Sequence, residues 1–416
     1  MAAPGPARLR RGQTTFVLAA TIAAACGGDG VGVPKAESPS DAPLVDIDVL
    51  DYAGAFRLPA APFGASDLNY SEGPIEVFGS SIFLVGHAHH QAIAEFEIPS
   101  LVHSSVLDDL EMASPPLQPF STILSRAPLN PEGLDRIAGL KWVDGAAGPE
   151  LLVNAYEYYD APGDNRRTTL VIRDPGDLAG SVIDGFYALE GAARVAGWMS
   201  PVPSEWQEAL GGPMIAGASS GIPIISRTSV GPSAFAFDPR SLAGQGALDT
   251  PVPTRPLLEY DLATPLHDDL SNTSGGNRLW THLSRAIYGF IVPGTRTYLT
   301  LGQSGGHGPE GVCYKCVPLG SDAACGGYCA RDPADYGLYY WAYDASDLEA
   351  AAGGERGPET IRPYASGPFP APFATSELGG GAFDAAAGLL YLTMQRADRG
   401  QGPYANPPVV VVFGIR

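Results

Sequence analysis

Apolar stretches that end in a short turn recur along the chain. A stretch of this kind followed by Leu occurs four times, as AEFEIPSL (94–101), LVIRDPGDL (170–178), AFAFDPRSL (234–242) and YWAYDASDL (340–348). Another apolar stretch that runs into a polar loop lies upstream of each copy, and a fifth lies near the end of the chain; these stretches are 81–91, 150–160, 222–229, 297–308 and 389–398. Repetition of one unit indicates a repeat architecture.

A short glycine-containing strand precedes each pair of stretches, in GPIEVFGS (73–80), AGLKWVDG (138–145), GPMIAGAS (212–219), AIYGFIVPG (286–294) and GGAFDAAAG (380–388). Each unit therefore reads as an antiparallel meander of short strands. Such a unit repeated around an axis leaves only short, protected sheet edges. The pattern predicts an all-β chain folded as a five-bladed β-propeller, with six blades or a two-sheet sandwich as alternatives.

The two ends of the repeat region are expected to meet. The fifth unit ends in VVVVFGI (409–415) with a strand missing, and an unassigned strand, DYAGAFRLP (51–59), is left over before the first unit. An unpaired edge in the last blade would expose backbone hydrogen-bonding groups. We therefore expect the strand at 51–59 to close the ring.

The N-terminal segment resembles an export signal. Arg8, Arg10 and Arg11 precede an apolar run (16–25) that ends in small residues before Cys26. The run has ten residues, and a helix that spans a bilayer needs about 20. Residues 1–25 are therefore predicted to be a signal peptide.

Two cleavages fit this segment. Ala23 and Ala25 suit ordinary signal peptidase, whereas a Cys in the next position is typical of a lipoprotein, although Ala23 stands where a lipobox usually has Leu. We favour lipidation of Cys26, because an unpaired Cys is otherwise unusual in an exported chain. Residues 26–45, rich in Gly, Pro and Ser, would then be a flexible tether, and 46–416 the propeller domain. The expected location is the cell envelope, as an outer-membrane or cell-surface lipoprotein.

Composition limits the fold and the classes of binding partner that can be expected. Gly 52 and Pro 39 are too many for a helix-rich fold. The formal net charge is −20, and the chain has just three Lys, at Lys35, Lys141 and Lys315. Binding nucleic acid requires clustered basic residues, so nucleic acid is excluded as a partner. The membrane is the expected partner through the N-terminal lipid, with a glycan, peptide or protein as ligand.

Four stretches resemble a known group of proteins. GHAHHQAIAEFEIP, NAYEYYDA, SRTSVGPSAFAFDP and YWAYDASDL are similar to segments of a family of uncharacterised secreted bacterial proteins with β-propeller-like repeats. The resemblance covers most of the chain after the signal. It implies export and a propeller fold, and it implies no activity, because none is established for that family.

In a propeller, the loops after the second strands and the connections between blades emerge on one face. The predicted ligand-binding rim on that face comprises His87, His89, His90, Tyr158, Tyr159, Asp160, Arg227, His307 and Arg396. Further polar residues of the loops are Gln303, Gln395 and Asp398, and the blade connections add Glu72, Glu132, Glu205 and Glu377. Polar groups that converge over a concave rim are the default hypothesis for a site, although loops are polar in any soluble protein.

The sharpest local feature is the histidine cluster GHAHHQ. In an extended segment His87 and His89 point to the same side, so together with a carboxylate they are weak candidates for a metal site. No metal-binding motif such as HExxH supports that reading, and hydrogen-bonded loop histidines are the alternative. No cofactor is expected.

The remaining cysteines, Cys313, Cys316, Cys325 and Cys329, lie within one insertion, 303–337. Their spacing would suit zinc in a cytosolic protein, but thiols of an exported protein oxidise. Two disulfides are predicted, and the sequence does not select among the three pairings.

No catalytic motif is present. We therefore expect a non-enzymatic envelope protein whose propeller binds a glycan, peptide or protein, with Tyr158, Tyr159, Tyr314 and Trp198 as candidate stacking residues. The alternative is a hydrolase or lyase that acts on a sugar or lactone-like substrate, with or without a metal, because propeller enzymes collect catalytic groups from separate blades.

Overall fold

The computed structural model describes residues 39–145, 148–219, 228–242 and 250–416, and the predicted signal peptide and Cys26 lie outside these ranges. The strands form five four-stranded antiparallel sheets, and each sheet is one blade of a β-propeller. The predicted all-β, five-bladed propeller is confirmed, and the six-bladed and two-sheet alternatives are wrong.

Each blade is numbered here by its place in the chain. Blade 1 contains β2 (Ile75–Phe78), β3 (Ser81–Val85), β4 (Ala92–Glu97) and β5 (Gln118–Thr122). Blade 2 contains β6 (Arg136–Gly145), β7 (Gly148–Tyr156), β8 (Thr169–Ile172) and β9 (Ile183–Tyr187). Blade 3 contains β10 (Met199–Pro201), β11 (Met214–Ala216), β12 (Ala234–Phe237) and β13 (Arg255–Leu258). Blade 4 contains β14 (Arg285–Ile291), β15 (Thr297–Gly305), β18 (Tyr336–Asp344) and β19 (Ala365–Pro368).

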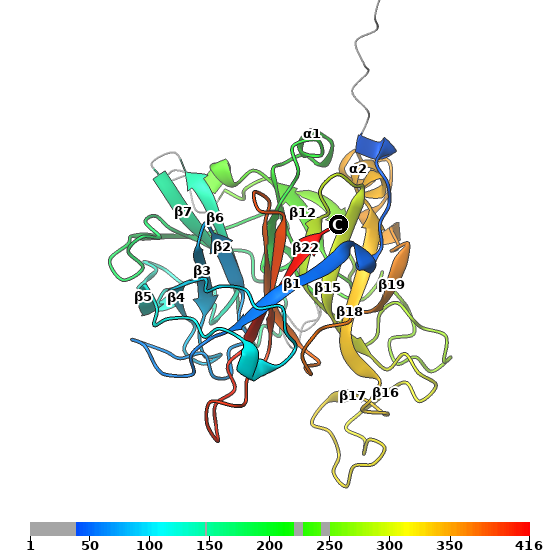
Figure 1. Ribbon diagram of the computed structural model, residues 1–416. Coiled ribbons are helices and arrows are strands. Elements are labelled where there is room, and N and C mark those ends of the chain that lie inside the picture. The colour runs from blue at the N-terminus through cyan, green and yellow to red at the C-terminus, as the bar shows by residue number, and fades with distance from the viewer. Residues whose placement is uncertain (1–38, 146–147, 220–227, 243–249) are drawn as a thin grey trace, which may run out of the picture. The chain divides into compact units, whose positions relative to one another are not determined.

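Blade 5 joins the two ends of the domain. It contains β20 (Leu378–Asp384), β21 (Leu389–Met394), β22 (Val409–Ile415) and, from the other end of the domain, β1 (Leu50–Arg57). β1 lies antiparallel to β22 from the pair Leu50 and Ile415 to the pair Arg57 and Val409, as the adjacent blue and red strands of Figure 1 show. The predicted closure of the ring by the N-terminal strand is confirmed.

The strand assignment in blade 3 needs correction. The segment 212–219 was expected to be the first strand of its unit, but β11 within it is the second strand, and β10 precedes it. β10 has only three residues, one of them Pro201, so its pattern is too short to identify in the sequence. Most of the segment predicted as the next strand, 222–229, lies outside the described residues.

A hydrogen bond between neighbouring blades recurs five times around the ring. In each case a polar side chain in a blade's second strand, or between its second and third strands, contacts the backbone of the next blade at or near its first strand. The five bonds are Ile137 N to Gln91 Oε1 (2.6 Å), Asn154 Nδ2 to Gly197 O (3.0 Å), Ser219 Oγ to Ala286 O (2.9 Å), Leu378 N to Gln303 Oε1 (3.3 Å) and Thr393 Oγ1 to Gly73 O (3.3 Å). These bonds give the blades a fixed register against one another.

Buried polar side chains fill the middle of the ring. Glu76 on β2 pairs with Lys141 on β6 and also accepts a hydrogen bond from Trp142 N. Burial raises the pKa of Glu76, and the Lys141 charge opposes that shift. Tyr288 on β14 is fully buried nearby, and its hydroxyl accepts from Phe383 N on β20. Four first strands thus meet around this polar centre.

The remaining elements lie outside the blades. They are the hairpin β16 (Val312–Tyr314) and β17 (Tyr328–Ala330), the helices α1 (Gln207–Leu210) and α2 (Ala345–Ala352), and single 3-10 turns at Pro39–Asp41, Ile47–Val49, Leu107–Asp109, Leu124–Arg126, Ala192–Val195, Pro239–Leu242 and Pro358–Thr360. In Figure 1 the hairpin and the two helices lie at opposite ends of the domain. Among the described residues, no helix is long and apolar enough to cross a bilayer.

The segment just before β1 packs on blade 4. Arg296 N donates to Pro43 O, and Val45 N donates to Thr297 Oγ1. The sequence places both Pro43 and Val45 in the tether that ends at residue 45. Within the described part of the chain, ordered contacts with the propeller therefore begin before residue 46.

Candidate functional site

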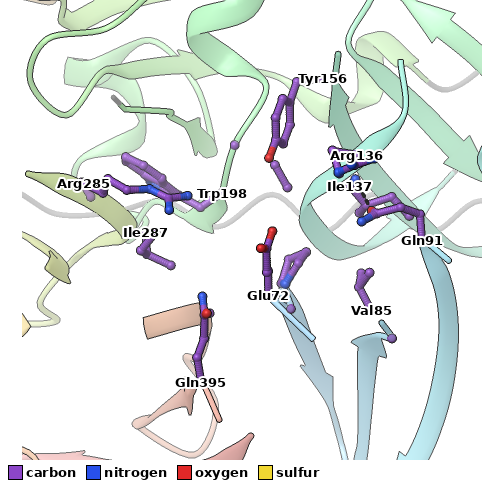
Figure 2. Close-up of a pocket in the computed structure, with 17 residues that line it drawn as sticks. Glu72, Val85, Gln91, Arg136, Ile137, Tyr156, Trp198, Arg285, Ile287 and Gln395 are labelled. Carbon is purple, nitrogen blue, oxygen red and sulfur yellow. Dashed lines mark hydrogen bonds between the residues drawn. The ribbon is translucent and has the colours of Figure 1, made fainter. Parts of the chain in front are cut away.

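The candidate site lies at one end of the propeller axis. The second strands β3, β7, β15 and β21 end there, and the first strands of the next blades begin there, because neighbouring strands run antiparallel. A cavity of about 40 Å³ at this end is lined by residues of all five blades. Figure 2 shows Glu72, Tyr156, Arg285 and Gln395 directed into it from different sides. We call it the axial cavity.

A wider hollow adjoins the axial cavity. This outer mouth has a volume of about 420 Å³ and is lined by Tyr70, Glu72, His87, Ala88, His89, Arg136, Tyr158 and Arg396. Glu72 and Arg136 line both spaces. The two spaces therefore lie next to each other, with Glu72 and Arg136 between them, and we treat them together as the candidate site.

β-Bulges direct the first strands toward this site. The register shifts between Ile137 and Gly139 on β6, between Ala286 and Tyr288 on β14, and between Leu378 and Gly381 on β20. A bulge bends the strand and re-aims the side chains beside it. Arg136 and Arg285 each stand immediately before such a bulge, and this explains how the first residue of a strand comes to line the axis.

Close packing of the backbone supports the bulge on β14. A Cβ added to Gly302 on β15 would lie 1.8 Å from Arg285 O, so no side chain fits at that position. Only glycine allows the two backbones to approach this closely. Gly302 thereby holds Arg285 in place at the axial cavity.

Three groups in the axial cavity lack protein partners. Among the described residues, the Glu72 carboxylate, the Tyr156 hydroxyl and the Arg285 guanidinium make no hydrogen bond or ion pair, and Arg285 Nε is buried without an acceptor. Buried polar groups are nearly always hydrogen-bonded in folded proteins, so the buried Arg285 Nε calls for an explanation. The Glu72 side chain is exposed. A carboxylate, a phenol and a guanidinium together are available to a ligand.

The electrostatic surroundings fix the role of Tyr156. Burial raises its pKa to about 12, although the positive charge of Arg285 acts in the opposite direction. The hydroxyl therefore keeps its proton at neutral pH and serves as a hydrogen-bond donor. Glu72 lines the same cavity, and its negative charge also raises the pKa of Tyr156.

Side chains of the outer mouth are more strongly engaged. Arg136 donates to the Asp135 carboxylate at 3.1 Å and lies 4.8 Å from the centre of the Tyr158 ring. Arg396 pairs with Glu377 at 3.5 Å. These contacts hold charged and aromatic groups around the opening and leave Tyr158 39% exposed.

His87 is a neutral hydrogen-bonding group at the outer mouth. Burial lowers its pKa, with a further contribution from His90. Its Nδ1 accepts from His89 N at 3.1 Å, so the proton of the neutral ring lies on Nε2. His87 and His89 belong to no group of three or more potential metal ligands within 4.8 Å of one another in the described chain; only Cys313, Cys316 and Cys329 form one.

Of the nine residues predicted for the rim, His87, His89, Tyr158 and Arg396 line the outer mouth. None of the others that the structure describes lines it. His90 contacts Ser66 Oγ at 3.1 Å beside a neighbouring hollow, Tyr159 is 61% exposed, and Arg227 lies outside the described residues.

Two further rim residues have structural roles. Asp160 is fully buried and accepts from the backbone N–H groups of Gly163 and Asn165. His307 is buried, contacts Ser304 Oγ and Asn277 O, and stacks on Tyr339. Both residues organise loops and do not line the site.

The four carboxylates predicted in the blade connections differ in their positions and partners. Glu72 lines both spaces and Glu377 holds Arg396. Glu132 accepts from the backbone of Arg166 and Arg167. Glu205 lies in the hairpin between β10 and β11, which is at the opposite end of the strands.

Sequence reasoning missed Arg136, Arg285 and Tyr156, which lie within the strands or at their ends. Arg136 and Arg285 are the first residues of β6 and β14, and Tyr156 is the last residue of β7. The sequence prediction placed the site in loops. The usable signal is the position of an isolated Arg immediately before an apolar strand, repeated in two units.

The cysteine insertion rises from blade 4. The structure pairs Cys313 with Cys316 and Cys325 with Cys329, in agreement with the prediction of disulfides. Cys313 and Cys329 are also opposite each other in the β16 and β17 pairing, so all four sulfurs belong to one small hairpin.

Comparisons with known proteins give structural likenesses only. No family model matches the chain, and no curated protein matches it. A candidate glycoside hydrolase from Bacteroides ovatus is 11% identical with a TM-score of 0.42, over 90% of this chain and 96% of that one. The GH43 endo-arabinanase from Bacillus licheniformis is 11% identical with a TM-score of 0.36, over 85% and 96%. The GH62 α-L-arabinofuranosidase domain of Coprinopsis cinerea is 12% identical with a TM-score of 0.33, over 87% and 96%. Likeness at this level does not indicate which ligand this chain binds.

Proposed function

We propose that this protein binds a sugar at the outer mouth and the axial cavity and cleaves a bond of that sugar, with Glu72 as the proton-transferring group. The observation that carries the proposal is the convergence of the unpaired Glu72, Tyr156 and Arg285 on one cavity. Sugars present many hydroxyl groups, and a carboxylate, a phenol and a guanidinium together can both accept and donate hydrogen bonds to them. The exposed Tyr158 at the mouth adds an aromatic face for a second ring.

The roles of the three groups follow from their chemistry. Glu72 can exchange a proton with a glycosidic oxygen or with a ring carbon of the sugar. Tyr156 stays protonated, because burial raises its pKa to about 12, and it donates a hydrogen bond. Arg285 supplies a fixed positive charge where negative charge develops or is bound.

Sugar binding without catalysis is the second candidate, and one observation favours it. Glycoside hydrolysis normally uses two carboxyl groups about 5–10 Å apart. Among the described residues, Glu72 is the one carboxylate that lines the axial cavity. The neighbouring Asp135 and Glu377 are engaged with Arg136 and Arg396.

The experiment compares the purified protein with Glu72→Gln on a panel of defined oligosaccharides. Products are separated by chromatography and identified by mass, because hydrolysis adds a water and elimination leaves a carbon–carbon double bond. We expect Glu72→Gln to lower kcat by about 100-fold or more and to keep the affinity for the sugar. Glu205→Gln, an exposed carboxylate at the opposite end of the strands, is the matched control.

Three outcomes are informative. Turnover that depends on Glu72 supports the enzyme. Sugar binding without turnover overturns the catalytic part and supports the second candidate. Binding of no sugar by the folded protein, or turnover that is unchanged in Glu72→Gln, contradicts the proposed function.

A further inference from the structure

We infer that the ligand of the axial cavity is an acidic sugar whose carboxylate binds to Arg285. The inference rests on the proposed function, because it names the class of sugar. It starts from the three arginines at the site. Arg136 pairs with Asp135 and Arg396 with Glu377, whereas Arg285 has no acidic partner in the described chain.

The unpaired guanidinium of Arg285 lowers the stability of the folded protein. Arg285 is half-buried, and its Nε is buried with no acceptor. A desolvated charge without a partner destabilises the folded state. The chain as a whole carries a formal net charge of −20, so acidic partners are abundant elsewhere. A cation left unpaired among so many acids is explained by an anion that comes with the ligand.

The shape of the cavity favours a carboxylate. Guanidinium offers two parallel N–H groups that match the two oxygens of a planar carboxylate. The axial cavity measures about 40 Å³, which is room for about three water molecules. That space admits a carboxylate group, and the rest of the sugar would lie in the outer mouth.

The other groups of the cavity call for hydroxyls. Glu72 is an acceptor, and Tyr156 is a donor. Gln395 donates from Nε2 to Leu378 O at 2.9 Å, which leaves its Oε1 as a further acceptor. A ligand that satisfies all of them brings one anionic group to Arg285 and hydroxyls to Glu72 and Gln395. A uronic acid, which is a sugar with a carboxylate at C6, has this combination.

Two matched pairs of sugars test the inference. Galacturonic acid and galactose differ in their C6 group, as do glucuronic acid and glucose. We would measure the affinity of the purified protein for each by calorimetry. The expected result is that at least one uronic acid binds about tenfold or more tightly than its neutral counterpart.

Variants test whether Arg285 causes the preference for the uronic acid. Arg285→Gln should remove the preference, because it should weaken the binding of the uronic acid by about tenfold more than it weakens the binding of the neutral sugar. Arg285→Lys keeps the positive charge but lacks the two parallel N–H groups of guanidinium, and it should retain part of the preference. Arg240→Gln is the control, because this arginine is 80% exposed and pairs with Asp238 outside the site. Thermal melting of each variant verifies folding, and Arg285→Lys serves if Arg285→Gln does not fold.

The outcomes separate the two proposals. Equal or tighter binding of the neutral sugars, or a preference that survives in Arg285→Gln, overturns the inference and leaves the proposed function standing. Binding of no sugar of either kind in this or the oligosaccharide panel overturns the proposed function. Preference for galactose 6-sulfate over galacturonic acid would show that the site takes a different anion, and it also contradicts the inference.

Discussion

The guanidinium of Arg57 on β1 holds the carboxylate of Asp398, which follows β21, through hydrogen bonds of 2.7 and 3.3 Å. Asp398 is fully buried, and it also accepts from Gln401 Nε2 and Gly400 N. The pair joins the strand from the N-terminal end of the domain to a loop 341 residues later in the chain. It therefore reinforces the closure of the ring beyond the β1 and β22 pairing.

We expect Asp398→Asn to lower the free energy of unfolding by about 3 kcal/mol, because the change leaves Arg57 without its charge partner in a nearly buried site. Asp238→Asn removes the carboxylate of an exposed pair with Arg240, and it should cost less than about 1 kcal/mol. Urea unfolding of both variants measures the difference. Equal losses would show that the buried pair does not stabilise the closure.

The lowered pKa of Asp398 predicts that its contribution to stability depends on pH. Burial raises the pKa of Asp398, but hydrogen bonds from Arg57, Gln401 and Gly400 outweigh burial and hold that pKa below its usual value. A carboxyl with a lowered folded-state pKa stabilises the protein above its unfolded pKa, and this contribution is lost as the pH falls through the folded value. The gap in stability between wild type and Asp398→Asn should therefore be constant from pH 7 to about 5 and shrink below about pH 4. A gap that widens on acidification contradicts this account.

Ring closure is tested by two deletions in the Cys26→Ser background. Removal of residues 50–57 takes away β1 and exposes the edge of β22, so the whole domain should lose its cooperative melting transition. Removal of residues 27–37, which precede the described chain, should leave the melting temperature unchanged. Equal melting temperatures for the two deletions would contradict a closing role for β1.

Close approach between neighbouring first strands makes a further prediction. A Cβ on Gly139 would lie 2.0 Å from Gly197 O, whereas a Cβ on Gly337 would meet nothing within 4 Å. We expect Gly139→Ala to destabilise the protein by about 2 kcal/mol or more and Gly337→Ala to change its stability by less than about 0.5 kcal/mol. Thermal melting compares them. A harmless Gly139→Ala would mean that blades 2 and 3 are less tightly packed than described.

The lipid on Cys26 remains a prediction from the sequence. Cys26→Ser should move the protein from the membrane to the soluble fraction, because a lipid chain is the expected anchor. Detergent partitioning of the two proteins measures this. Unchanged partitioning of the variant would exclude lipidation as the anchor.

Disulfides in the insertion can be tested by intact mass before and after alkylation, with and without reduction. We expect the thiols of Cys313, Cys316, Cys325 and Cys329 to be alkylated only after reduction. Peptide mapping should find the pairs Cys313–Cys316 and Cys325–Cys329. Free thiols with stoichiometric zinc would overturn the disulfide prediction. Replacement of all four cysteines by Ser should leave the melting of the propeller unchanged, because the hairpin lies outside the five blades.

The repeat pattern predicted the architecture because strands β4, β8, β12 and β18 share one phrase that ends in a turn. It failed where strands were too short to have a pattern, as in β10. The outer mouth was partly predicted, since His87 and Tyr158 lie in polar loops. Arg285 was missed, because its role depends on a bulge in β14, and a bulge is set by contacts with β15 that a single strand's sequence does not contain.

The filled centre of the ring has a consequence for how a ligand travels. Glu76, Lys141 and Tyr288 occupy the axis below the cavity, so the described structure offers no passage through the propeller. A ligand that reaches the axial cavity must therefore enter and leave at the same end of the propeller. Under the proposed function, the product would have to leave by the route that the next substrate uses, so product and substrate would compete for the outer mouth.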